Sequence, residues 1–359
     1  MIYRTFFVVV LSLNCIDGFS QTLKAKLLDF QKQPIEGVKV FYDKSTIFTY
    51  TNDNGIFEIP VVSVVPDPSL VFFHPNFKIF EVSVTDTLRS VYYLKQKEEK
   101  AETPNTSSTN FPAEEMYQVF RENFLGRTRN SKKTAILNNE VLQLGFDTIN
   151  YTFSAKALKP IQIQNNALGY RIEYYLQDFK LVYAANTLDN ALLDFKFYDG
   201  YSLFKDIDHT KTKPREKAYE GTVNHFFKNI IQGDFRKIKS KVFTDKKRIR
   251  LKKLFNIREI KDGIYKLQLK REMLNYQDDG DFKFYIQPHH TKPGSRTYHF
   301  SGSGYTYYRN KSSTLALYRP YILVDKYGNA LDHEYFGISG EILEIDLADL
   351  LPIEYHLID

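Results

Sequence analysis

The pattern that most constrains the fold is a short-period alternation of apolar and polar residues near the start of the chain. Leu23, Ala25 and Leu27 alternate with two lysines, which is the period-two pattern of a strand with one buried face. Short apolar segments recur at residues 38–42 and 70–73. Segments of this length, separated by turn residues, predict strands for this part of the chain.

Turn residues separate these segments. Pro34 lies in a polar stretch where its fixed φ suits a turn, and Gly37 permits a positive φ before the next strand. Residues 52–55, Asn-Asp-Asn-Gly, predict a hairpin turn between strands at residues 47–51 and 56–59. A calcium loop is the alternative for this acidic turn, but the spacing of its acidic residues does not match one.

These motifs occur in a characteristic order: a strand at residues 23–29, Pro-Ile-Glu-Gly at 34–37, Asn-Asp-Asn-Gly-Ile-Phe at 52–57 and an apolar strand at 70–73. This order resembles the carboxypeptidase regulatory-like domain, a small transthyretin-like β-sandwich. The sequence departs mildly from the family at residues 75–77, where a small residue and an aromatic usually end the last segment. In that family the module folds and docks but does not cut peptides, so the resemblance implies an architecture and no reaction.

The first twenty residues have the pattern of a cleaved signal peptide. Arg4 gives a positively charged start, and residues 5–13 are apolar but too few to span a bilayer. Gly18 and Ser20 are small residues at the positions that signal peptidase reads, so cleavage before Gln21 is expected. The mature chain is therefore expected in the periplasm, at the outer membrane or on the cell surface.

Cys15, the one cysteine of the chain, offers a lipoprotein signal as the alternative, although Asn14 stands where a lipobox has a small residue. Cleavage before Gln21 removes this thiol and excludes disulfides, cysteine-ligated metals and a cysteine nucleophile from the mature chain. No later apolar segment is long enough for a membrane-spanning helix. A peripheral membrane contact remains compatible with the sequence.

Residues 96–110 are the clearest boundary, because they are charged and then polar and lack large apolar side chains. The predicted organisation is a signal peptide at residues 1–20, a β-sandwich at 21–95, this flexible linker and a larger domain at 111–359. The chain contains 26 Tyr, 29 Phe and no Trp, and such an aromatic content favours strands.

The region after residue 110 is predicted to be a β-rich α+β domain with a few helices. A helix is expected from residue 111 to Gly126, with Tyr117, Phe120 and Phe124 on its apolar face. Alternating segments predict strands at residues 146–157, 161–164, 170–183 and 192–204. A second helix is expected over residues 214–231, closed by Gly233.

Five parts of this region carry a second resemblance, at residues 120–126, 136–139, 163–170, 215–221 with 225–226, and 340–352. They look like the part that follows the regulatory-like domain in a group of uncharacterised secreted bacterial proteins. The two resemblances together cover nearly the whole mature chain. They imply an envelope protein of bacteria with two membranes, and no activity is carried over.

The sequence lacks the motifs of the common catalytic classes. None of the eight histidines has Glu three residues later, as a zinc carboxypeptidase requires. There is also no Gly-x-Ser-x-Gly elbow and no phosphate-binding Gly-x-x-x-x-Gly-Lys loop. We therefore expect a non-catalytic protein without metal or cofactor. With a net charge of +6, an exported chain is expected to meet anionic lipid or polysaccharide and not nucleic acid.

Two groups of residues are candidate sites. The first is a stacking platform for a glycan, with ordinary packing on a sheet as the alternative; it consists of Tyr305, Tyr307, Tyr308 and Arg309. The second is a polar cluster with an acid and a histidine for general acid–base chemistry, with structural hydrogen bonding as the alternative; it consists of Arg215, Tyr219, Glu220 and His225.

Two weaker patterns complete the candidates. His289, His290 and His299 with Tyr298 suggest a metal or sugar site, and a loop is the alternative, because adjacent residues of a strand point to opposite faces. Residues 236–253 hold ten Lys or Arg and one Asp. They are expected either to contact anionic envelope polymer or to form a solvated basic face.

The expected function is that of an exported, non-catalytic envelope protein that binds protein or glycan. A hydrolase acting on envelope peptide or glycan is the alternative. The binding hypothesis predicts an exposed aromatic patch without titratable groups of perturbed pKa. The hydrolase hypothesis predicts carboxylates or histidines that converge in one cleft.

Overall fold

The computed structural model describes most of the chain between Thr22 and Tyr355. The segments outside this description are residues 1–21, 62–68, 84–88, 99–110, 221, 239, 244–247, 262, 279–280, 289–296, 302–303, 309–312, 332–335, 340–345 and 356–359. The predicted signal peptide and most of the predicted linker lie among them. Within the described residues the fold is mainly β with three α-helices, which confirms the predicted fold class.

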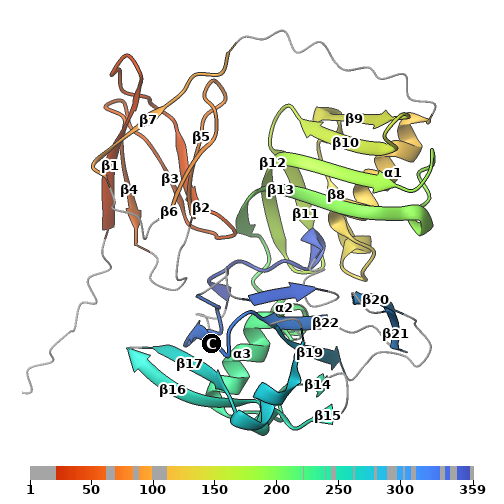
Figure 1. Ribbon diagram of the computed structural model, residues 1–359. Helices are drawn as coiled ribbons and strands as arrows, with labels where there is room; N and C mark the ends of the chain where they lie inside the picture. The colour runs from red at the N-terminus through yellow and green to blue at the C-terminus, as the bar shows by residue number, and fades with distance from the viewer. Residues whose placement is uncertain are drawn as a thin grey trace, which may run out of the picture.

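The N-terminal part is a sandwich of two sheets (Figure 1). One sheet has the order β4 (Ile56–Pro60), β1 (Thr22–Asp29), β7 (Val91–Leu94). The other sheet has the order β3 (Phe48–Tyr50), β2 (Lys39–Tyr42), β5 (Ser69–Phe73), β6 (Phe80–Ser83). Leu23, Ala25 and Leu27 are all buried between these sheets, as the alternation predicts.

The turn at Asn52–Gly55 is present, but the prediction of a hairpin is wrong. The amide of Gly55 donates to the carbonyl oxygen of Asn52 at 2.8 Å, and Gly55 adopts a φ of +71°. The flanking strands enter different sheets, because β3 pairs with β2 whereas β4 pairs with β1. The turn is therefore the crossover that carries the chain from one layer of the sandwich to the other.

Residues 96–98, which the sequence places in the linker, belong to the sandwich. The amide of Lys78 donates to the carbonyl oxygen of Lys95 at 2.8 Å, and the amide of Lys97 donates to that of Asn76 at 2.9 Å. Charged composition predicts solvent exposure here, but it does not exclude backbone pairing at the edge of a sheet.

The middle part is a six-stranded sheet with α1 (Ala113–Leu125) packed on one face. Its strands are β8 (Thr134–Ile136), β9 (Leu142–Asp147), β10 (Thr152–Ala157), β11 (Ile161–Asn165), β12 (Tyr170–Tyr183) and β13 (Leu193–Asp206). The predicted helix is confirmed, and Phe120 and Phe124 on its apolar face are fully buried. The four predicted strand segments are also present, the first as the hairpin β9–β10.

β12 and β13 pair along 14 residues each, and a bulge between Leu176 and Asp178 interrupts their register. Before the bulge, Ile172 and Tyr174 face the core under α1; after it, Phe179 and Leu181 do. The inward positions change from even to odd numbers because one extra residue shifts the alternation. The bulge thus keeps the apolar residues on one face of a strand that is much longer than average.

The C-terminal part has its own hydrophobic core. One sheet contains β14 (Ser240–Phe243), β15 (Arg248–Ile249), β18 (Gln277–Asp278), β19 (Asp281–Pro288), β22 (Ser313–Leu317) and β24 (Phe336–Ser339). A second sheet contains β16 (Phe255–Lys261), β17 (Ile264–Leu269) and β23 (Tyr321–Asp325). β20 (Thr297–Ser301) and β21 (Gly304–Tyr308) form a hairpin. Among the described residues no helix combines the length and the apolar character needed to cross a membrane.

The single helix predicted over residues 214–231 is wrong, because two helices occupy this region, α2 (Thr212–Tyr219) and α3 (Val223–Gln232). The Thr222 side chain caps α3 by accepting a hydrogen bond from the amide of His225 at 3.1 Å. Apolar periodicity continues across the break, which is why the pattern alone predicts one helix. The break lets α2 pack on the middle part while α3 enters the C-terminal core.

The sandwich is docked on the face of β12 and β13 that points away from α1. Phe41 stacks on Tyr175 with ring centroids 5.0 Å apart, and Val71 and Leu203 complete a fully enclosed apolar cluster. At one edge of this cluster Lys39 Nζ lies 2.6 Å from a carboxylate oxygen of Glu173. The sandwich is therefore more than tethered, because side chains of both parts are buried against each other.

Backbone hydrogen bonds also join the two parts. The amide of Lys44 donates to the carbonyl oxygen of Ser202 at 2.7 Å, and the amide of Phe204 donates to that of Ser45 at 2.8 Å. Ser45 thereby forms a parallel bridge with Leu203. A loop of the sandwich acts as one more short strand along the end of β13.

The last described segment closes the same junction. The first residues of the 3-10 helix η7 (Leu347–Asp349) are fully buried in the middle core. A few residues later the amide of Ile353 donates to the carbonyl oxygen of Lys44 at 2.8 Å, and the Glu354 carboxylate accepts from both the amide and the hydroxyl of Thr46. The C-terminal segment therefore clamps the sandwich to the middle part.

The docked interface predicts the effect of Tyr175→Ala. Tyr175 is 2% exposed, so its removal should lower the free energy of unfolding by about 3–5 kcal/mol, as for other buried aromatics. Hydrogen exchange should accelerate more at the amides of Lys44 and Phe204 than within β1. The control is Tyr93→Ala on the sandwich, where the ring is 44% exposed and the change should stay within about 0.5 kcal/mol. Equal acceleration at all these amides would contradict a separate docked interface.

Candidate functional site

Arg215, from the predicted polar cluster, is buried where α2 meets the turn between β11 and β12. Its guanidinium binds both carboxylate oxygens of Asp206, at 2.7 and 2.8 Å. It also donates to the carbonyl oxygen of Leu168 at 2.7 Å and lies 3.9 Å from the centre of the Tyr170 ring. These contacts join α2 to the ends of two strands, which is a structural role.

The carboxylate of Asp206, the partner of Arg215, is kept in its charged form. Burial raises the pKa of Asp206, but the hydrogen bonds and the charge of Arg215 outweigh burial and leave the pKa below its usual range. A carboxylate that is ionised and held by a bidentate pair is poorly suited to donating or accepting a proton in catalysis.

The other three members of the predicted cluster lie at the junction of α2 and α3. Tyr219 and His225 are in contact, with ring centroids 5.4 Å apart and planes at 84°. Glu220 immediately follows α2. The structure therefore brings Tyr219 and His225 together, whereas the guanidinium of Arg215 is directed to Asp206.

The predicted tyrosine platform falls on the hairpin of β20 and β21. Tyr305, Tyr307 and Tyr308 belong to β21, and Tyr298 is paired with Tyr307 across the hairpin. Arg309 and the histidine pair at 289–290 lie outside the described residues. The platform and the histidine site therefore stay predictions.

The basic stretch at residues 236–253 divides its residues between core and surface. Val242 and Ile249 are buried in the C-terminal core. A cavity of about 430 Å³ opens beside them, and its rim carries exposed cations that form no ion pair with another described residue: Arg236, Lys241, Arg248, Arg250 and Lys252. This placement is compatible with both alternatives for the stretch, a polymer contact and a solvated face.

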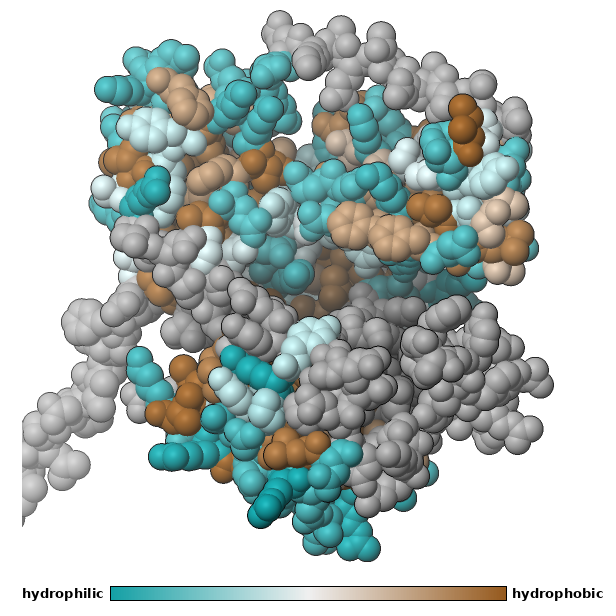
Figure 2. Space-filling model, in the orientation of Figure 1, coloured by the Kyte–Doolittle hydropathy of each residue, from teal (hydrophilic) through white to brown (hydrophobic). Residues whose placement is uncertain are grey.

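An exposed aromatic pair lies elsewhere, on the same face of β12 and β13 that receives the sandwich. Phe195 and Phe197 are 54% and 43% exposed. Their rings are nearly parallel, with an angle of 8° between planes and 6.4 Å between centroids. Figure 2 shows apolar residues gathered over these strands on a largely hydrophilic face. The sandwich covers one half of this sheet face and leaves the aromatic half open.

Polar side chains continue the open face beyond the rings. In the sheet register Phe197 is opposite Lys180, which is opposite Ser154 on β10; Phe195 is opposite Val182, which is opposite Thr152. The ammonium group of Lys180 lies 3.3 Å from the carboxylate of Asp178. We call this surface, from β13 to β10, the open sheet face. It offers two aromatic rings beside hydroxyl, ammonium and carboxylate groups.

Asp147, the last residue of β9, is a titratable group at the end of the open sheet face, opposite Thr152. Hydrogen bonds from the side chain and amide of Asn150 and from the amide of Ile149 lower the pKa of Asp147. This carboxyl therefore stays ionised at neutral pH and does not provide a proton donor. The open sheet face therefore has the exposed aromatic patch that the binding hypothesis predicts, whereas the lowered pKa of Asp147 departs from that hypothesis.

One pattern in the sequence could have predicted this exposed surface, namely aromatic residues on both faces of one strand. Residues 195–198 read Phe-Lys-Phe-Tyr, so both alternating faces of the strand carry aromatic residues. Tyr198 packs inward against Phe124, with ring centroids 5.7 Å apart. Since one apolar set is enough for a strand covered on one side, the second set marks a surface with another purpose.

Comparison with known proteins adds no relative. No protein-family model matches the chain, and no curated protein matches it.

The structural role of Arg215 predicts a large loss of stability in Arg215→Ala. Breaking the buried pair leaves Asp206 without its partner, which should lower the free energy of unfolding by about 3 kcal/mol or more in urea titrations. Arg171→Ala is the control, because Arg171 is exposed on β12 and contacts Gln164, and its change should stay within about 0.5 kcal/mol. Equal unfolding free energies for Arg215→Ala and Arg171→Ala would contradict a structural role of Arg215.

The same pair predicts a pH dependence. The pKa of Asp206 is lower in the folded chain than the value of about 3.9 in the unfolded chain. Its contribution is therefore present above about pH 4 and is lost as pH falls through the folded pKa. The unfolding free energy of the wild type should decrease more steeply between about pH 4 and pH 2 than that of Asp206→Asn. Parallel curves in acid titrations would show that this carboxyl is not linked to folding.

Proposed function

We propose that this chain is an exported, non-catalytic protein of the bacterial envelope that binds glycan through the open sheet face. The observation that carries the proposal is the parallel, exposed pair of Phe195 and Phe197. Parallel rings can both contact one flat ligand, and the apolar faces of sugar rings pack well on aromatic rings. Hydroxyl and charged groups on the adjoining strands supply hydrogen bonds for sugar hydroxyls.

The N-terminal sandwich is proposed to be a carboxypeptidase regulatory-like domain. Its two layers, its crossover at Asn52–Gly55 and its lack of a converging catalytic set among the described residues support this assignment. A docking role fits the interface with β12 and β13, since the sandwich covers an apolar part of the sheet face and leaves the aromatic part open. The sandwich would thus set where the open sheet face ends.

The hydrolase alternative has less support. It requires acids or histidines that converge in one cleft. In the candidate cluster the Arg215 guanidinium instead binds the Asp206 carboxylate, whereas Tyr219 and His225 contact each other. Asp147, at the end of the open sheet face, has a lowered pKa and does not provide a proton donor. Binding without turnover is the function that these groups suit best.

The test compares two aromatic pairs of similar exposure. The site variant is Phe195→Ala/Phe197→Ala, and the control is Phe48→Ala/Tyr50→Ala on the sandwich. The control rings are 46% and 51% exposed, but they meet at 89°. Binding is measured by sedimentation with isolated peptidoglycan sacculi and by affinity electrophoresis in gels that contain purified envelope polysaccharide.

The site variant should bind at least about tenfold more weakly than the wild type, from the loss of two aromatic contacts. The control should bind as the wild type does. Equal binding by all three proteins would move the glycan site away from the open sheet face. Capture of one envelope protein in place of any glycan, lost only in the site variant, would replace glycan by protein as the ligand.

A further inference from the structure

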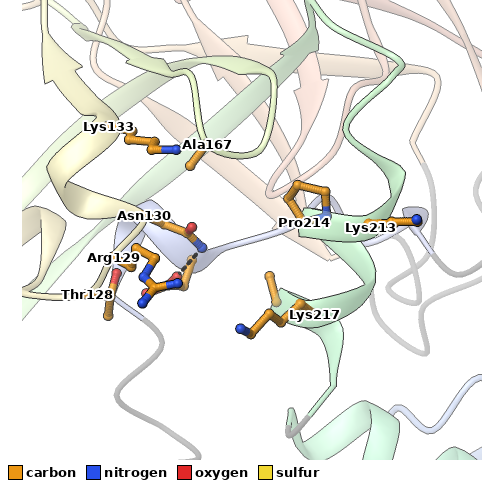
Figure 3. A pocket seen from close by; sticks show the side chains of 10 residues that line it. Thr128, Arg129, Asn130, Lys133, Ala167, Lys213, Pro214 and Lys217 are labelled. Carbon is orange, nitrogen blue, oxygen red and sulfur yellow. Dashed lines mark hydrogen bonds between the residues drawn. The ribbon is translucent and has the colours of Figure 1, made fainter.

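A cavity of about 550 Å³ lies where three distant segments of the chain meet (Figure 3). One wall is the loop after α1 that contains Arg129 and the 3-10 helix η1 (Ser131–Lys133). The second wall is the first two turns of α2, and the third is formed by Ala167 and by Asp349 of η7. No strand of the open sheet face contributes a described residue to the lining of this cavity.

Four cations line this cavity, Arg129, Lys133, Lys213 and Lys217, and the charged ends of three of them are directed into it. Figure 3 shows the charged ends of Arg129, Lys133 and Lys217 directed toward the space between the walls, whereas Lys213 points away from it. None of the three forms an ion pair with another residue in the part of the chain that the structure describes. Like charges that lie close together without a counterion repel each other, so an anion bound between them is favoured.

The carboxyl in the cavity wall does not neutralise these cations. Asp349 Oδ1 accepts a hydrogen bond from Asn130 Nδ2 at 2.6 Å, and the carboxyl also binds the Thr128 side chain. Burial raises the pKa of Asp349 above its usual value, and these hydrogen bonds only partly offset that effect. The carboxyl is occupied with holding the loop, and the lining as a whole keeps a positive charge.

The cavity is held open by contacts outside it. Arg215 fixes α2 to the carbonyl oxygen of Leu168, and the Asn165 side chain donates to the carbonyl oxygen of Ala348 at 2.8 Å. Arg121 donates to the carbonyl oxygen of Ser131 at 2.9 Å and so supports the loop of η1. Because each wall is fixed, a ligand would not have to order the backbone when it binds.

We propose that this cavity binds a small ligand that carries two or more negative charges, in the form of phosphate or carboxylate groups. Arg129, Lys133 and Lys217 would bind the charged groups, since guanidinium and ammonium groups are the usual partners of both. Ala167, Pro214 and Ala218 provide an apolar wall for a ring or carbon chain attached to them. This site does not rest on the proposed glycan binding.

The test uses calorimetric titration of the full mature chain with inorganic pyrophosphate. Lys133→Ala and Lys217→Ala should each weaken binding at least fivefold. The matched control is Lys132→Ala, which removes the same charge from the neighbouring residue of η1 that is not part of the cavity lining, and it should change binding less than twofold. All three lysines are exposed, so the variants should keep the wild-type unfolding temperature. Equal weakening in all three variants, or binding of neither pyrophosphate nor citrate by the wild type, would overturn the site.

Further titrations identify the chemistry of the ligand. Citrate replaces pyrophosphate to test carboxylates, and phenyl phosphate tests the contribution of the apolar wall. Binding of either should weaken as the salt concentration rises from about 0.01 to about 0.1 M, because the screening length falls from about 30 to about 10 Å. Affinity that does not change with salt would contradict a site based on charge.

The outcome is independent of the glycan proposal. The Phe195→Ala/Phe197→Ala variant should bind pyrophosphate as the wild type does, and Lys217→Ala should keep its affinity for polysaccharide. If Phe195→Ala/Phe197→Ala loses pyrophosphate binding as well, the two surfaces are not separate sites and the inference fails.

Discussion

The long pairing of β12 with β13 provides both surfaces on which the N-terminal sandwich and α1 pack. A sheet has two faces, and this pair uses both: one packs under α1, and the other receives the sandwich over part of its length. The bulge at Leu176/Asp178 makes this possible, because it keeps Tyr174 and Phe179 on the same inner side. Tyr175, on the opposite side, is thereby available to the sandwich, and Phe195 and Phe197 remain open beyond it.

Two polar contacts fix other segments around this pair. Arg215 joins α2 to Asp206 at the end of β13, and Glu354 joins the C-terminal segment to Thr46 of the sandwich. Loss of Arg215 would leave the Asp206 charge without its partner, so the pair specifies where α2 packs. A further consequence is geometric, because the cavity with Arg129 and Lys217 exists only while these segments stay in place.

Both proposed ligand sites consist of residues that the packing of the fold does not require. A strand covered on one side needs one apolar set, and β13 has a second set in Phe195 and Phe197. Protein surfaces usually mix charges of both signs. In one cavity, however, Arg129, Lys133 and Lys217 lie together and form no ion pair with another described residue.

Local structure could be predicted from the amino-acid pattern: the alternation at Leu23–Leu27, the left-handed residues Gly37 and Gly233, and the existence of α1 and of the long strands. Period and turn chemistry act between neighbours, so they can be recognised without knowing the fold. Long-range contacts set which sheet each side of the Asn52–Gly55 turn joins, where the helix predicted over residues 214–231 divides, and which apolar residues stay exposed. They also bring Arg129, Lys217 and Asp349 to one cavity. These features depend on contacts between residues far apart in the chain, and periodicity carries no information about such contacts.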